Sequence, residues 1–416
     1  MEFAHRFLEV LQKKDRKATL VHHNDADGLC AAAVLARAFE TLGVCYDLLP
    51  IEKLHPAVLE KIFSREEGTC FVFLDLGGQN PELIGRYAAG NQPVLILDHH
   101  LPSQEIPESI LCINPENFGI SGDTEISGAS VAAFFAEQLL AEAERTRSGR
   151  AAGPAARLTS ELTAELAAYG VIGAYGDRQA PDNRFHGANQ LLFKTARKQG
   201  LIAEGPGTLR FPAFEPANPE KIVEILDSLG SIGFYSGGAR LGVRFLLGRD
   251  RQPALDTAAD LIAEKNRLFH GKAEQIRKNG LSKSRHFQWI DVQSSFFPMG
   301  VKAIGLFLEH LLAAQIPDPR RYLLGFQHFP DSQPGIGKLD LSCTKVSSRV
   351  PGQLKRRIQQ DGSPDYMRLL PEAVGRIGGI ADGCHRFAAA ALIDRGREKE
   401  LIRALEDLMP AAPAGR

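Results

Sequence analysis

Acidic and imidazole side chains recur at the ends of apolar segments in the first 180 residues. The apolar run at 18–23 leads into alternating His and Asp residues, and the runs at 70–77 and 93–100 also carry Asp or His near their ends. A helical stretch at 161–176 delivers one more carboxylate. Because ligands of open α/β sheets bind outside the carboxyl ends of the strands, we expect these groups to meet at one edge. They are His23, Asp25, Asp27, Asp75, Asp98, His99, His100 and Asp177.

Any one of these side chains, taken alone, has a structural explanation. An Asp at a strand end often caps a helix or lies in a turn, and paired histidines can be held by structural hydrogen bonds. Together, however, so many carboxylates and imidazoles at one end of a sheet would be electrostatically costly without cations. The grouping therefore predicts a site for divalent metal ions.

Mixed Asp and His ligation is typical of Mn²⁺, Mg²⁺, Fe²⁺ or Zn²⁺, and not of the all-oxygen sites of Ca²⁺. Two such ions about 3.5–4 Å apart can orient a bridging hydroxide, lower its pKa and stabilise charge on an attacked phosphorus. Phosphate ester hydrolysis is the reaction that most needs this help. We expect two divalent ions as the cofactor, with Mn²⁺ favoured over Mg²⁺.

The elements that must position these groups follow from the alternation of apolar runs and helical stretches, which predicts an α/β fold with a mostly parallel sheet flanked by helices. A long helix at 253–280 is expected to link this domain to a smaller α/β domain with strands and two helices, beginning near 286. The irregular stretches at 141–158 and 201–220 are interpreted as a helix end with a surface loop and as a connection. Strands are expected at 18–23, 44–50, 70–77, 93–100 and 111–114, and helices beginning near Gly28, Pro81 and Ser127.

Four short motifs carry a family resemblance. HNDADG at 23–28, LDLG at 74–77, LDHH at 97–100 and GAYGD at 173–177 resemble, in this order and spacing, motifs I to IV of the DHH phosphoesterase superfamily. The resemblance implies a DHH metal-binding catalytic domain over 1–250, a helical linker over 251–285 and a DHH-associated substrate-binding domain over 286–416.

The same resemblance implies a role for each motif residue. His23 and Asp25 would bind one metal, and Asp27, His99 and Asp177 the other. Asp75 would bridge the two ions. His100 would contact the scissile phosphate or protonate the leaving oxygen, and Asp98 would orient a histidine. Ser127-Gly128-Ala129 also matches a family position, where we expect helix capping.

A glycine-rich segment near the C-terminus, GGIADGCHRFAA at 378–389, resembles the GGGHxxAAG signature of the DHH-associated domain. Cys384 replaces one glycine and Ala390 stands in place of the last. Small residues would let backbone N–H groups approach a phosphate at a helix N-terminus, although plain helix packing is the alternative. The residues expected to bind substrate are Arg349, Gly383, His385 and Arg386.

The associated domain points to RecJ-like exonucleases and nanoRNases, so we expect hydrolysis of single-stranded DNA or RNA or short oligonucleotides. The alternatives are a small-molecule phosphoesterase acting on pAp, a cyclic dinucleotide or pyrophosphate, and a non-catalytic replication scaffold. Family II pyrophosphatases differ in their second domain and in the spacing of the first motif. With 7% aromatic residues, base stacking along a long strand is not evident.

Composition sets the remaining expectations. Hydrophobic residues make up 44% of the 416 residues and charged residues 24%, which is typical of an ordinary globular protein. The net charge is −6 over 1–278 and +5 over 279–416, which fits a metal-loaded site beside a phosphate-binding surface or chance variation. Six scattered cysteines are expected to be reduced, and those in apolar segments, Cys30, Cys45, Cys70 and Cys112, are expected to be buried. The protein is expected in the cytoplasm and without a membrane partner. Homo-oligomerisation is left open.

Overall fold

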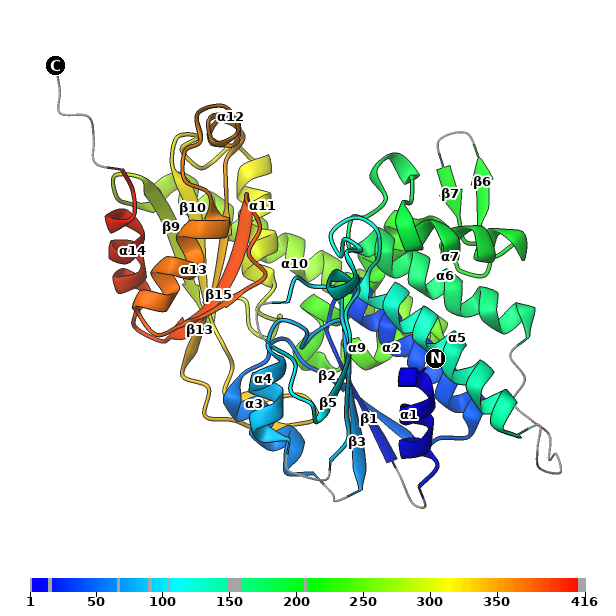
Figure 1. The fold of residues 1–416 in the computed structure, drawn as a ribbon. Helices are drawn as coiled ribbons and strands as arrows, with labels where there is room; N and C mark the ends of the chain where they lie inside the picture. Colours follow the sequence, from blue (N-terminus) through cyan, green and yellow to red (C-terminus); the bar gives the residue numbers. More distant parts are fainter. Residues whose placement is uncertain are drawn as a thin grey trace. The chain divides into compact units, whose positions relative to one another are not determined.

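The computed structural model describes residues 2–13, 17–65, 68–88, 92–102, 105–147, 159–205 and 208–410. The chain divides into two compact units (Figure 1). The N-terminal unit comprises Met1–Ala259 with Pro334–Gly337, and the C-terminal unit comprises Asp260–Gln333 with Lys338–Arg416. The long helix expected at 253–280 is confirmed as α10, Arg251–Asn279, and the division falls within it.

The N-terminal unit is built on a parallel sheet whose strands lie in the order β2-β1-β3-β4-β5. β3 and β4 are buried along their whole length, and so is β1 after its first residue. This burial confirms the expectation of strands covered on both faces. The strands are β1 (Lys17–His22), β2 (Tyr46–Pro50), β3 (Thr69–Leu74), β4 (Val94–Leu97) and β5 (Ile110–Ile113).

Helices cover this sheet. α2 packs against β1, β2 and β3, and α5 packs against β3 and β4 and also against α1, α2 and α6. In Figure 1 the paired helices α3 and α4 lie on the opposite side of the sheet from α1 and α5. The elements are α1 (Glu2–Leu11), α2 (Ala26–Leu42), α3 (Pro56–Phe63), α4 (Pro81–Tyr87), η1 (Pro115–Phe118), α5 (Gly128–Arg147), α6 (Ser160–Gly176), η2 (Pro181–Asn183), α7 (Gly187–Lys198), β6 (Ala203–Gly205), β7 (Thr208–Arg210), α8 (Pro219–Asp227), η3 (Ser228–Ile232), η4 (Phe234–Ser236) and α9 (Gly238–Leu246).

The strand order decides where a ligand can bind. From β1 the chain moves to β2 on one side of β1, and then crosses to β3 on the other side. The connection after β1 thus leads to β2 and the connection after β3 leads to β4 on the opposite side, and such a switch point is where ligands of open α/β sheets bind. His23 follows β1 and Asp75 follows β3, so the sheet topology places the first and second sequence motifs at this switch point.

The C-terminal unit contains a mixed sheet in the order β14-β15-β13-β10-β9-β8, in which only the β9 and β10 pair is parallel. The sequence predicted two helices here, and the described residues of this unit form four beyond α10. The elements are β8 (Ser282–Lys283), β9 (Phe287–Gln293), α11 (Ala303–Ala313), β10 (Tyr322–His328), β11 (Ser332–Gln333), β12 (Gly337–Lys338), β13 (Cys343–Arg349), α12 (Gly352–Asp361), α13 (Tyr366–Arg376), β14 (Ile380–Asp382), β15 (Ala388–Asp394) and α14 (Glu398–Asp407).

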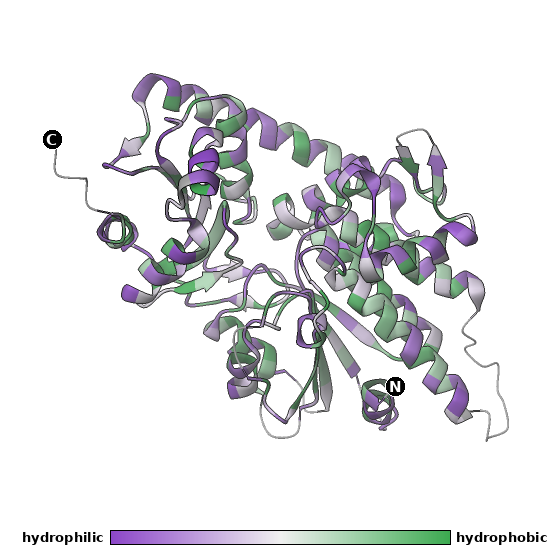
Figure 2. Cartoon of the chain, turned by 45° about the horizontal axis from the view of Figure 1, so that its top comes forward, coloured by the Kyte–Doolittle hydropathy of each residue, from purple (hydrophilic) through white to green (hydrophobic). Residues whose placement is uncertain are grey.

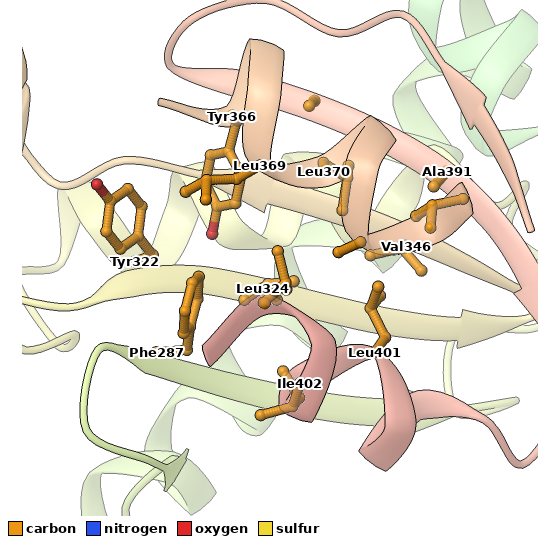
Figure 3. Close-up of a cluster of buried hydrophobic side chains, with 14 of the residues drawn as sticks. Phe287, Tyr322, Leu324, Val346, Tyr366, Leu369, Leu370, Ala391, Leu401 and Ile402 are labelled. Atoms are coloured by element: carbon orange, nitrogen blue, oxygen red, sulfur yellow. The ribbon is translucent and has the colours of Figure 1, made fainter. Parts of the chain in front are cut away.

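Alternation along β10 builds the two sides of this sheet. Leu324 and Phe326 join a buried cluster with residues of α13 and α14 (Figure 3). Gly325 points to the other face, where a side chain would collide with Ile304 and Leu308 of α11. Helices therefore cover both faces of the second sheet, as the period-two alternation of a strand requires.

Three expectations of local structure are wrong. The glycine-rich segment does not begin a helix: Gly383 to Phe387 connect the antiparallel strands β14 and β15, because residues 388–394 pair with β13 and β14 as a strand. The expected connection at 201–220 contains the β6–β7 hairpin. Cys45 is exposed, whereas Cys30, Cys70, Cys112 and Cys343 are buried, Cys384 is half-buried and all six are free thiols.

The N-terminal helix α1 is amphipathic. Phe7, Leu8 and Leu11 of α1 are buried, and Figure 2 shows both hydrophobic and hydrophilic residues on the helix beside the N label. Among the described residues, every helix is too short or too polar to cross a membrane. Most of the loop expected at 141–158 lies outside the described residues.

A half-buried carboxylate on α14 binds the segment that directly precedes β9. Glu406 accepts hydrogen bonds from Ser284 Oγ (2.6 Å) and from the backbone N–H of His286 (2.8 Å), and it contacts His286 Nδ1 (2.6 Å). Burial opposes ionisation, but these hydrogen bonds outweigh it and lower the pKa of Glu406 below its usual 4.5. Its contribution to stability is therefore present above about pH 4.5 and is lost as the pH falls through the folded-state pKa.

We predict that Glu406→Gln lowers the stability of the C-terminal unit at pH 7 by about 1–3 kcal/mol, the usual cost of a lost charged hydrogen bond. The single tryptophan, Trp289 in β9, reports this unit, so urea unfolding of the whole chain can be followed by its fluorescence. Glu400→Gln on the same helix, which loses only an exposed pair with Arg397, is the matched control. A Glu406→Gln deficit that stayed constant from pH 7 to below pH 4 would contradict the assignment.

Candidate metal centre

Consecutive side chains at the carboxyl end of β1 point in opposite directions. His22 is fully buried, which lowers its pKa to about 4, and its Nδ1 donates to the carbonyl of His23 (2.8 Å). His23 instead faces the carboxylates, with Nδ1 2.9 Å from Asp25 Oδ2 and 3.4 Å from Asp75 Oδ2. Asp25 also caps α2, because its Oδ1 accepts from Gly28 N (3.0 Å). Strand end and helix start thus present His23 and Asp25 together.

The backbone turns sharply at Asp75, directly after β3. Its φ of 59° lies in the left-handed region, which a non-glycine residue occupies only at a cost and which Asp tolerates better than most. The turn directs the two carboxylate oxygens to different neighbours. Oδ2 lies 3.4 Å from His23 Nδ1, and Oδ1 lies 3.2 Å from His99 Nε2. Asp75 therefore stands between two groups of donor atoms.

Asp98 organises the two histidines that follow β4. Its Oδ1 accepts from His99 N (2.8 Å) and from His100 Nδ1 (2.7 Å), and its Oδ2 accepts from Gly78 N (2.7 Å). Burial opposes the ionisation of Asp98, but the neighbouring His100 and these hydrogen bonds lower its pKa below the usual range. Since protein donors already engage both oxygens, Asp98 orients His100 and is not itself directed at the centre.

His99 has its proton position set by the backbone. Its Nδ1 lies 2.7 Å from the carbonyl oxygen of Gly122, and because a carbonyl can only accept, Nδ1 must carry the proton. Nε2 then faces three carboxylates: Asp75 at 3.2 Å and Asp27 and Asp177 at 3.8 Å each. In the neutral imidazole this nitrogen has a free lone pair, as a metal ligand needs.

Asp27 is held at the N-terminus of α5. Its oxygens accept from Ser127 Oγ (2.8 Å), Gly128 N (2.7 Å) and Ala129 N (3.0 Å). Ser127 Oγ also accepts from Ser130 N (3.3 Å), so the capping expected of this segment is present. The helix end therefore stabilises the charge on a carboxylate that comes from α2.

The six candidate ligands form two sets, and within each set the donor atoms all lie within 4.8 Å of one another. The first set is His23, Asp25 and Asp75, and the second is Asp27, His99 and Asp177. Asp177 enters the second set as the residue that follows α6. Each set combines imidazole nitrogen with carboxylate oxygen, the donor chemistry that Mn²⁺ and similar ions prefer.

The carboxylates of the two sets repel one another. Burial, followed by repulsion from Asp27 and Asp25, raises the pKa of Asp75 well above its usual value. The protein atoms around Asp177, whose side chain is 36% exposed, and the charge of Asp27 raise its pKa to about 6, against the opposing effect of His99. Burial lowers the pKa of His99, but its close contact with Asp75 and the charges of the nearby carboxylates outweigh this and raise it well above 6.5. Cations would offset the same repulsion.

Part of the N-terminal unit matches a known protein family. The model of the DHH family, N-terminal domain, matches residues 17–171. The match covers less than half of the chain. An uncharacterized protein of Methanocaldococcus jannaschii is 33% identical over 125 residues, which are 29% of this chain and 28% of that relative. The matched segment is thus less than a third of the relative's length.

Solved structures extend the likeness to both units. RecJ from Thermus thermophilus, crystallised with Mn²⁺, matches with a TM-score of 0.63 and 16% identity over 97% of this chain and 53% of that one. An exonuclease RecJ bound to manganese matches with a TM-score of 0.61 and 16% identity, covering 97% of this chain and 92% of that one. The fold is therefore RecJ-like, as the motifs implied.

The four residues predicted to bind substrate lie in the C-terminal unit and differ in their exposure and in their contacts. Arg349 ends β13 and pairs with Glu309 of α11 (Nη2 to Oε1, 2.9 Å). Gly383, with a φ of 59°, begins the turn between β14 and β15. His385 is exposed in this turn, and the exposed Arg386 beside it pairs with Asp365 (3.2 Å).

Several residues that position the centre were missed by the sequence analysis. Asn114, fully buried after β5, donates to the carbonyl of His100 (2.8 Å). Gly122 supplies the carbonyl that contacts His99, and Gln179 donates to Asp177 (2.7 Å). The signal for Asn114 was available, since it ends the fifth expected strand at the same sheet edge. Gly122 and Gln179 lie in loops whose contacts have no local sequence pattern.

Close packing of α6 against Asp27 depends on Gly173. A Cβ there would lie 2.3 Å from Asp27 Oδ1 and 2.4 Å from Ala129 Cβ. We predict that Gly173→Ala destabilises the protein by about 1–3 kcal/mol, the usual cost of overpacking, and displaces Asp27.

Thermal unfolding followed by circular dichroism, with and without Mn²⁺, measures both effects. Gly271→Ala, in the open middle of α10, is the matched helical control and should be neutral or stabilising. Equal melting temperatures for the two variants would contradict the proposed close approach.

Proposed function

We propose that this protein is a two-metal-dependent phosphoesterase that hydrolyses single-stranded or short oligonucleotides. The position of Asp75 carries the proposal: its two oxygens face His23 of one donor set and His99 of the other. A carboxylate shared in this way suits a pair of adjacent divalent ions. The DHH family match and the RecJ-like fold, shared with RecJ structures that hold manganese, support the same reaction class.

The residues present fit such an ion pair. His23 and Asp25 would hold one ion and Asp27, His99 and Asp177 the other, with Asp75 common to both. Bound divalent ions would neutralise the buried carboxylates and polarise a phosphate and a water molecule. We favour Mn²⁺, with Mg²⁺ as the alternative, because each set has two carboxylates and one imidazole, and RecJ structures of similar fold hold manganese.

The remaining side chains of the centre would act on the substrate. Asp98 holds His100 through Nδ1, so Nε2 is the nitrogen that can reach a phosphate or give a proton to the leaving oxygen. The side chain of His100 is 31% exposed, whereas that of Asp98 is 1% exposed. We therefore propose His100 as the catalytic residue and Asp98 as the residue that orients it.

A basic surface of the C-terminal unit supports an oligonucleotide substrate over pyrophosphate. Helix α12 carries three consecutive exposed basic residues, Lys355, Arg356 and Arg357, which the sequence analysis had not singled out. Lys355 and Arg386 lie 5.6 Å and 5.7 Å from the ring centroid of Phe387. Basic groups around an aromatic ring are a common arrangement for binding phosphates and bases of single strands. We propose that Gly383, His385, Arg386 and Arg349 contribute to the same phosphate binding.

The test is a substrate panel with Mn²⁺ or Mg²⁺: 5′- and 3′-labelled single strands of DNA and RNA, dinucleotides, pAp, cyclic dinucleotides and pyrophosphate. We expect hydrolysis of single strands or short oligonucleotides, abolished by a chelator and restored by Mn²⁺. Activity on pyrophosphate alone would overturn the oligonucleotide proposal. Absence of hydrolysis with every substrate and ion would favour the scaffold alternative.

We predict that Asp75→Ala lowers turnover by at least about 100-fold, because it removes the ligand shared by both donor sets. The matched control is Asp47→Ala on β2 of the same sheet, whose half-exposed side chain pairs with Lys17. Circular dichroism checks that both variants fold. Retention of more than about a tenth of the wild-type rate by Asp75→Ala would contradict the shared-ligand role.

Arg386→Ala should raise KM for an oligonucleotide by roughly 10-fold with little change in kcat, since it removes a charged phosphate contact and no group of the metal centre. Arg376→Ala, which loses an exposed pair with Glu372 on α13, is the control. Steady-state kinetics on a labelled oligonucleotide distinguish the two. An unchanged KM, or a loss confined to kcat, would remove Arg386 from the substrate-binding surface.

A further inference from the structure

A chain of buried amide and hydroxyl groups lies behind the second donor set. Gln179 and Asn189 are 2% and 0% exposed, and neither was expected to have a role in the centre. Gln179 follows α6 by three residues, and Asn189 lies in the first turn of α7. Their side chains contact each other, and Gln179 Oε1 accepts from Asn189 Nδ2 (2.7 Å). Buried amides of this kind need a full set of partners, and both have them.

The network reaches each ligand of the second set by a different route. Gln179 Nε2 donates directly to Asp177 Oδ2 (2.7 Å). It also donates to the carbonyl of Gly122 (2.6 Å), the same oxygen that contacts His99 Nδ1. The third route runs through Asn189 Oδ1, which accepts from Ser130 Oγ (2.7 Å) and from Ser127 N (3.4 Å), and Ser127 Oγ donates to Asp27.

The direction of donation in this network is fixed. Gln179 Nε2 faces only oxygens that accept, those of Asp177, Gly122 and Ile126. If the amide were flipped, its oxygen would face these acceptors and its NH₂ group would face the NH₂ of Asn189. One orientation alone satisfies every partner, so the network is rigid and the three ligands share one support.

We infer that Gln179 and Asn189 are positioning residues that set the metal affinity of the Asp27, His99 and Asp177 set. This inference rests on the proposed two-metal function and adds an asymmetry to it. The first set lacks such a link to Gln179 among the described contacts, since Asp25 is held by its own helix cap at Gly28. Loss of the amide network should therefore weaken one ion site and spare the other. Hydrogen-bond partners of metal ligands commonly change affinity by about 10–100-fold.

The test is Mn²⁺ titration of the metal-free full-length protein by calorimetry and by electron paramagnetic resonance. Gln179→Met keeps the length of the side chain and removes its hydrogen bonds. We expect two Mn²⁺ sites in the wild-type protein and, in this variant, a roughly 10–100-fold weaker affinity at one site only. Gln190→Met, on the exposed face of α7 beside Asn189, is the matched control and should bind as the wild type does.

Two further variants separate positioning from general destabilisation. Ser130→Ala deletes one hydroxyl of the network without adding volume, so it tests the inference even if Gln179→Met does not fold. In an Asp177→Ala background, Gln179→Met should reduce affinity by less than it does alone, because residues that act through each other are not additive.

The outcomes distinguish the inference from the proposed function. Two wild-type Mn²⁺ sites that Gln179→Met and Ser130→Ala leave unchanged would overturn the inference and leave the two-metal function intact. Equal weakening of both sites would also overturn it, since the asymmetry would be absent. A wild-type protein that binds neither Mn²⁺ nor Mg²⁺ would remove both.

Discussion

Mutual repulsion among buried carboxylates is the constraint on which this structure depends. Asp75 follows β3, and Asp25 and Asp27 lie at the start of α2, directly after the neighbouring strand β1. Asp27 and Asp75 are buried and Asp25 is half-buried, and burial together with their proximity raises the pKa of Asp75 well above its usual value. A fold that brings such groups together must offset the cost with donors and cations. The donors are visible: the N-terminus of α5 binds Asp27, and His99 lies among three carboxylates.

The sheet topology and the packing of glycines make this convergence sterically feasible. His23 and Asp75 follow the neighbouring strands β1 and β3, and the left-handed backbone at Asp75 turns its oxygens toward both donor sets. Gly128 and Gly173 then bring α5 and α6 so close that a Cβ at either would collide with Asp75 or Asp27. The left-handed backbone at Asp75 and the two tightly packed glycines occur at the same place. Such local strain is characteristic of a site selected for geometry over stability.

The two units would contribute charges of opposite sign to the proposed reaction. The N-terminal unit concentrates negative charge that suits cations, whereas the C-terminal unit has a net charge of +5 over 279–416 and exposes basic residues on α12 and at Arg386. The glycine-rich turn at 383–387 connects two antiparallel strands, so phosphate contacts there would come from exposed side chains and turn backbone and not from a helix N-terminus. The stability of this unit rests on its own core around Leu324 and Phe326.

The sequence by itself determined the parallel sheet and the eight candidate residues, because apolar runs that end in Asp or His are local patterns and parallel strands share one edge. Only the tertiary structure decided which oxygen of Asp75 meets which histidine, and that Gly122, Gln179 and Asn189 support His99, Asp177 and Asp27. These contacts join residues up to about a hundred positions apart, as between Asp27 and Ser127. The glycine-rich segment was misjudged for the same reason: its partner strand β13 lies some forty residues earlier, and pairing across that distance has no local signature.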